Sequence, residues 1–110
     1  MTTEEQEEIY QEFKDNINVP PSEIEDWLDT DESKSVGIDS GDGESKGRKS
    51  AKRIIEIRRK NKDELTKDDY SHMKKVNAYV KRHSAQKPSG DIEDSNWRYS
   101  LMNWGHDPMK

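Results

Sequence analysis

The chain has 110 residues, of which 27% are hydrophobic and 39% are charged, and its formal net charge is −5 at pH 7. Leu, Ile, Val and Phe together supply only 16 residues, too few for a large hydrophobic core or for a multi-domain enzyme with a deep pocket. The absence of Cys excludes disulfides, a thiolate nucleophile and Cys-ligated zinc. We therefore predict one small domain spanning residues 1–110.

The charges are segregated along the chain. Residues 1–44 carry a net charge of −13, residues 45–87 carry +10 and residues 88–110 carry −2. Such asymmetry is typical of a nucleic-acid contact. It is equally typical of acidic and basic helices that pack together and neutralise each other, so both interpretations stay open.

The beginning of the chain is acidic and lacks an apolar run, which predicts that it is not a signal peptide. No stretch of the sequence approaches the roughly 20 apolar residues of a membrane-spanning helix. We expect a cytoplasmic protein with no membrane partner.

The spacing of the apolar residues predicts a first helix over residues 4–16, capped by Thr3. Pro20 and Pro21 end that element, and Ser22 with Glu25 has the pattern of a capping box for a short second helix ending near Asp29. Residues 30–47 are polar and rich in Gly, which predicts a long flexible loop anchored by Val36 and Ile38.

A third helix is predicted from Ser50 to Lys60, with isoleucines on one side and cations on the other. A turn follows, and Thr66 is the expected N-cap of a fourth helix that ends near His83. The two helices match either a helix-turn-helix-like unit or a plain helical hairpin.

A last helix is predicted over residues 96–104, capped by Asp94 or Ser95 and followed by Gly105 as the residue after its C-cap. Residues 1–3 and 106–110 are expected to be disordered ends. The resulting fold class is all-α, a small, loosely packed bundle of about five short helices. We expect its three Trp and four Tyr to supply much of the buried surface.

Patterns of catalytic or ligand-binding residues are weak. The segment over 43–50 has only three residues between its glycines where a phosphate-binding P-loop has four. The acidic segment beginning at Asp29 lacks the EF-hand spacing. His72 and His83 are eleven residues apart on one helix, too far to share a metal. We expect no enzyme activity, no cofactor and no metal.

Nucleic-acid binding is the best supported function. Phosphate binding requires only clustered Lys and Arg, because released counterions supply the affinity. The fourth helix offers the first candidate contacts and the third helix the next. In that order the candidates are Lys74, Lys75, Lys81, Arg82, Arg48, Lys49, Lys52, Arg53 and Arg59. The predicted partner is duplex DNA, bound with little sequence preference because Lys residues dominate.

Two alternatives remain beside this prediction. The basic residues can simply be solvated, an interpretation that the low isoelectric point of about 5.2 favours. The chain can also be a protein-interaction or regulatory module, since the segment over 97–106 is rich in the Trp, Tyr and Arg that binding hot spots use. In that segment, burial of Trp97 and Trp104 in the core is the favoured interpretation. The oligomeric state is not predicted.

The closing segment NWRYSLMNWGHDPMK resembles the signature of an uncharacterised microbial family, domain of unknown function number 3140. Similar segments lie at 27–37, 43–57 and 65–88, so the resemblance covers nearly the whole chain. The family pattern has Gly where Ala51 stands and a His near Lys49. Some members are described as DNA-binding, so the resemblance implies a nucleic-acid role, and it implies no catalytic or cofactor residues.

Overall fold

The computed structural model describes residues 2–36 and 45–110, and these residues form helices with no β-strand among them. The α-helices are α1 (Thr3–Asn16), α2 (Pro21–Leu28), α3 (Asp31–Ser35), α4 (Lys46–Arg59), α5 (Lys67–Ser84) and α6 (Asn96–Asn103), and a short 3-10 helix, η1, spans Lys62–Glu64. The predicted all-α class is therefore confirmed.

Hydroxyl side chains cap most of the helix N-termini, as the sequence predicted. Thr66 accepts from the backbone N–H of Asp69 at the start of α5, and Ser95 accepts from the backbone N–H of Arg98 at the start of α6. At α1 the prediction is one residue late, because the cap is Thr2, whose Oγ1 accepts from the backbone N–H of Glu5. Each cap satisfies a backbone donor that has no partner within its helix.

The predicted capping box at Ser22 is wrong. Helix α2 begins at Pro21, Pro20 occupies the N-cap position without a side-chain hydrogen bond, and Ser22 lies inside the first turn. Proline favours this first helical position because its fixed φ is already helical and its missing N–H is not needed there.

Helix α4 begins four residues before the predicted start at Ser50. Ser45 caps it by accepting from the backbone N–H of Arg48. Gly47, which we expected to prevent a helix, is buried in the first turn, and a Cβ there would lie 3.1 Å from Trp104 Nε1 and 3.3 Å from Asn103 Cβ. The absence of a side chain at Gly47 thus lets α4 approach α6 closely.

The segment predicted as one long loop contains a helix. Residues 31–35 form α3, capped by Thr30, whose Oγ1 accepts from the backbone N–H of Ser33. Val36 is buried, which confirms its predicted role as an anchor. Ile38, and the loop prediction for residues 37–44, lie outside the described residues.

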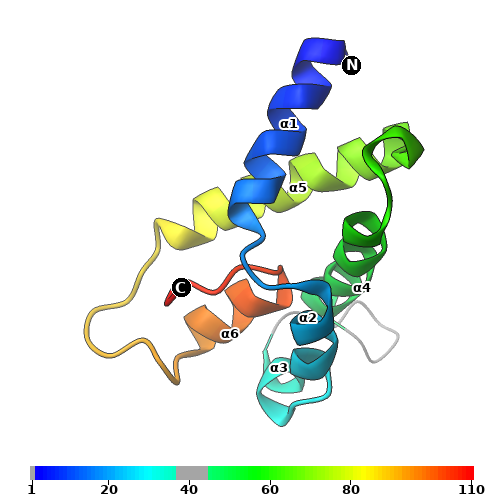
Figure 1. Ribbon diagram of the computed structural model, residues 1–110. Coiled ribbons are helices and arrows are strands. Elements are labelled where there is room, and N and C mark those ends of the chain that lie inside the picture. The colour runs from blue at the N-terminus through cyan, green and yellow to red at the C-terminus, as the bar shows by residue number, and fades with distance from the viewer. Residues whose placement is uncertain (1, 37–44) are drawn as a thin grey trace.

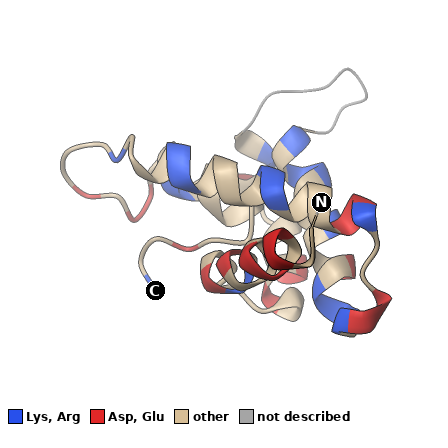
Figure 2. Cartoon of the chain, turned by 90° about the horizontal axis from the view of Figure 1, so that it is seen from above, with Lys and Arg blue, Asp and Glu red and all other residues tan. Residues whose placement is uncertain are grey.

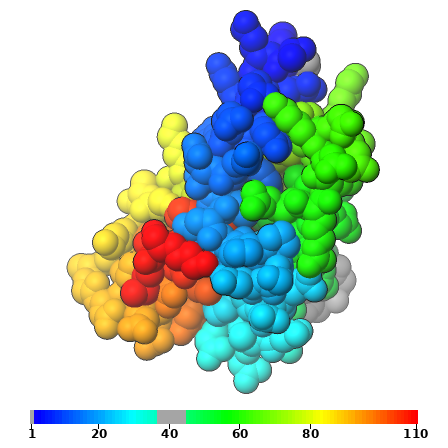
Figure 3. Space-filling view, in the orientation of Figure 1, coloured from blue at the N-terminus to red at the C-terminus, as the bar shows by residue number. Residues whose placement is uncertain are grey.

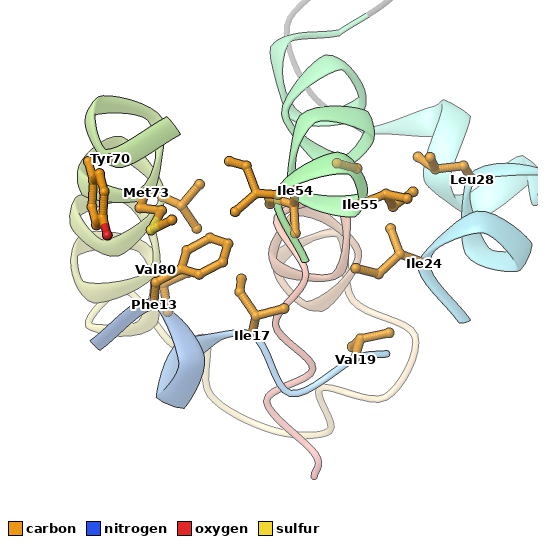
Figure 4. Close-up of a cluster of buried hydrophobic side chains, with 13 residues drawn as sticks. Phe13, Ile17, Val19, Ile24, Leu28, Ile54, Ile55, Tyr70, Met73 and Val80 are labelled. Carbon is orange, nitrogen blue, oxygen red and sulfur yellow. The ribbon is translucent and has the colours of Figure 1, made fainter. Parts of the chain in front are cut away.

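The hydrophobic core is mainly aliphatic (Figure 4). Phe13 and Ile17 from α1 and the following linker meet Ile54 of α4 and Met73 of α5. The prediction that Trp and Tyr supply much of the buried surface is wrong for the centre of the core. All three Trp are only partly buried, and of the four Tyr only Tyr70 is buried. Tyr10 and Trp104 pack against the core from partly buried positions.

Helix α6 holds the bundle together (Figure 1), since it contacts α2, α3, α4 and α5. Helix α1 packs along α5, and α2 packs along α4. Helices α4 and α5 touch each other less than they touch these partners, so they do not form the tight hairpin that the sequence allowed. Within the described part of the chain, this arrangement leaves one long side of α5 without a covering helix.

The C-terminal residues 106–110, predicted to be disordered, pack against the rest of the molecule (Figure 3). Gly105 turns the chain with φ +77°, the left-handed conformation that glycine adopts readily, as predicted for the residue after a helix C-cap. Beyond it, Asp107 is buried, and its side chain accepts from the Arg98 guanidinium at 3.1 Å. The backbone N–H of Asp107 donates to Asn18 Oδ1 at 2.7 Å.

Candidate nucleic-acid interface

Four cations lie on the uncovered side of α5, and we call Lys74, Lys75, Lys81 and Arg82 the α5 basic surface. All four are exposed. At 100° per residue they fall within about a third of the helix circumference, while the buried residues of α5 lie on the other side, and among them are Met73, Val76 and Val80. The four residues that the sequence predicted as the first phosphate contacts therefore lie on one face of α5.

Among residues 2–36 and 45–110, no acidic side chain forms an ion pair with this surface. Helix α1 and helix α5 carry their charges on separate bands (Figure 2). Glu7 pairs with Lys62, Glu25 with Arg59 and Glu23 with Lys110. None of the ion pairs within residues 2–36 and 45–110 involves the α5 basic surface.

The predicted contacts on α4 are placed differently. Arg48 is partly buried, and its Nη1 donates to the Leu28 carbonyl at 2.7 Å and to Ser33 Oγ at 2.9 Å. It thereby ties α4 to α2 and α3, and it does not share a face with the α5 cations. Arg59 pairs with Glu25 of α2.

Arg53 is also hydrogen-bonded within the fold. Its Nη2 and the Lys60 Nζ each lie 2.8 Å from a carboxylate oxygen of Asp69, which is 1% exposed. Burial alone would raise the pKa of Asp69, but hydrogen bonds from Lys60, the Thr66 backbone and Arg53 outweigh it and hold the pKa well below its usual value. The carboxylate stays charged and joins the two helices. Lys49 and Lys52 are exposed and also interact within the molecule.

A cleft opens beside the α5 basic surface, between the start of α4, the middle of α5 and the end of α6. Its volume is about 480 Å³, within the range of small-molecule sites. Lys75 and Arg82 of the basic surface line it, together with Lys46 from the first turn of α4. Lys46 is exposed and was not among the predicted contacts. The structure thus joins three cations from two helices around one opening.

Aromatic rings form part of the cleft wall. Tyr79 and Trp104 stack with their ring centroids 4.2 Å apart and their planes 14° from parallel. Tyr79 also stacks on His83 at 5.1 Å, and His83 lies 6.2 Å from Trp97. Burial raises the pKa of Tyr79 and lowers that of His83. Both rings are therefore uncharged near neutral pH.

His72 lies on α5 with its Nε2 2.9 Å from Ser50 Oγ. Burial lowers the pKa of His72, and the positive charges of Arg53 and Lys75 lower it further. The imidazole is neutral at pH 7 and adds no charge to the surface. Among the described residues, no three His, Cys, Asp or Glu side chains are grouped to hold a metal ion.

The aromatic C-terminal segment is used within the fold. Trp97 Nε1 donates to the His83 carbonyl at 2.7 Å, and Trp104 packs against the core. Across the described ranges Met109 is the one large hydrophobic side chain that is strongly exposed, at 51%.

Comparison with known proteins gives a family but no activity. The model of a family described as "Protein of unknown function (DUF3140)" matches residues 12–102. The searches of curated proteins and of solved structures return no match. Within the described part of the chain, none of the helices has the length and apolar character required to cross a membrane. The matched range includes the C-terminal end of α1, α2 to α5 entire and most of α6, and the chain therefore belongs to the DUF3140 family of proteins of unknown function.

Proposed function

We propose that this protein binds nucleic acid with low sequence preference, through backbone phosphates that contact the α5 basic surface. The observation that carries the proposal is that Lys74, Lys75, Lys81 and Arg82 are all exposed on one face and free of ion pairs within the described residues. Lys46 extends the positive surface across the cleft to α4. Binding to phosphates releases condensed counterions, which supplies affinity without reading sequence.

Low sequence preference follows from the residue types. Lysine presents a flexible point charge, whereas arginine can form the two parallel hydrogen bonds that read guanine. Arg82 is the one arginine of the α5 basic surface. On α4, Arg48 and Arg53 are hydrogen-bonded within the fold. The proposed contact therefore positions a phosphate backbone and leaves base edges largely unread.

Replacing the four residues of the α5 basic surface by alanine is expected to weaken binding to a fluorescein-labelled DNA duplex by about tenfold or more at low salt, because four phosphate contacts are lost. Fluorescence anisotropy measures the affinity. The matched control replaces Lys14, Lys34, Arg58 and Lys87, which are exposed residues outside α5, and removes the same charge. Equal losses in the two fourfold variants would show that net charge, and not this face, determines binding.

A further inference from the structure

We propose that the cleft between α4, α5 and α6 receives an unpaired base of single-stranded nucleic acid, while the adjoining phosphates lie against Lys46, Lys75 and Arg82. The proposal rests on the phosphate-binding function proposed above and adds the form of nucleic acid that this site prefers. Three features of the cleft support it, and they concern its charge, its aromatic wall and its size.

The charge around the cleft suits a phosphodiester backbone. Lys46 approaches from α4, and Lys75 and Arg82 stand two helical turns apart on α5. None of the described residues that line the cleft is acidic. The Tyr79 hydroxyl, which hydrogen-bonds to Ser100, stays protonated near neutral pH and does not repel an anion. A chain of phosphates can therefore lie against these lining residues without meeting a negative charge among them.

The wall of the cleft suits a flat aromatic base. The rings of Tyr79 and Trp104, which stack on each other, line the cleft beside Gly47. Proteins that bind single strands without sequence preference combine a positive groove with aromatic side chains on which bases stack. The cleft has both components, and they come from helices that are separate in sequence.

The volume of about 480 Å³ accommodates one nucleotide and not a double helix. In a duplex the bases are paired and stacked in the interior, so they reach such a cleft only after unstacking. A single strand exposes its bases at no such cost. We therefore expect the protein to bind a single strand that carries bases more tightly than a phosphate backbone without bases.

The experiment compares three fluorescein-labelled ligands with the full-length protein by anisotropy: a 12-nucleotide oligothymidylate, an abasic strand of equal length, and a 12-base-pair duplex. The abasic strand carries the same phosphates without bases. We expect oligothymidylate to bind about fivefold more tightly than the abasic strand, or better, since stacking of one base on an aromatic ring has an effect of that order.

Ala78→Leu tests the cleft directly. Ala78 is exposed and lines the cleft, so leucine fills the space without removing a charge or a core residue. It should reduce the affinity for oligothymidylate to that for the abasic strand and leave abasic and duplex binding unchanged. The matched control is Ser71→Leu, an exposed position of α5 outside the cleft lining, which should bind all three ligands as the wild type does.

The outcomes separate the two proposals. Equal, salt-dependent binding of oligothymidylate and the abasic strand overturns the base-binding cleft and leaves the phosphate-binding function standing. An Ala78→Leu variant that keeps the wild-type preference for oligothymidylate also overturns the cleft. Failure to bind any of the three ligands at low salt overturns both proposals.

Discussion

Replacing Asn103 by leucine is expected to lower the free energy of unfolding by about 3–4 kcal/mol, because several buried polar groups lose their partners at once. The Asn103 side chain is 1% exposed. Its Oδ1 accepts from Trp27 Nε1 at 2.7 Å and from Ser33 Oγ at 2.5 Å, and its Nδ2 donates to the Ser33 carbonyl at 3.2 Å. One amide of α6 thus holds α2 and α3 in place.

Chemical denaturation of the variant, followed by circular dichroism, measures this loss. The matched control is Asn96→Leu, which makes the same substitution at an exposed position in the first turn of α6. We expect that control to change stability by less than about 0.5 kcal/mol. A loss below about 1 kcal/mol for Asn103→Leu would contradict the role assigned to this amide.

Replacing Asp69 by asparagine is expected to cost about 2–3 kcal/mol at pH 7, because the buried carboxylate holds two cations and the N-terminus of α5. Arg53 and Lys60 are 39% and 36% exposed, so each can turn to water when the charge is lost, which keeps the cost at this level. The matched control is Asp68→Asn, one residue earlier in the same helical turn and exposed. It should cost less than about 0.5 kcal/mol.

The same pair of variants tests the sign of the pH dependence. The pKa of Asp69 is lower in the folded chain than in the unfolded chain. Its stabilising effect is therefore fully present above the ordinary carboxyl pKa of about 4, and it is lost as the pH falls below that value. The difference in unfolding free energy between the wild type and Asp69→Asn should shrink in acid. A difference that stays constant from pH 7 to about pH 3 would contradict the depressed pKa.

Much of the fold could be predicted from local sequence patterns. Helix α5 follows directly from its apolar stripe and from Thr66 as its cap, and α6 from Ser95 and Gly105. The errors occur where a distant part of the chain decides the local structure. Gly47 discourages a helix by its own propensity, but α4 includes it because α6 packs against that turn.

The candidate site was predictable only in part, for the same reason. The α5 basic surface comes from one helix, so its periodicity reveals it. The roles of Arg48 and Arg53 depend on Ser33 and Asp69, which lie 15 and 16 residues away. The cleft unites Lys46, Tyr79 and Trp104, which no local pattern connects.

The salt dependence of binding to a DNA duplex tests the central claim most directly. If the four cations of the α5 basic surface each neutralise a phosphate, the logarithm of the association constant should fall against the logarithm of salt concentration with a slope of about −3.6. Their replacement by alanine should remove most of this slope. No binding in dilute buffer, or a slope that the fourfold replacement leaves unchanged, would contradict the account.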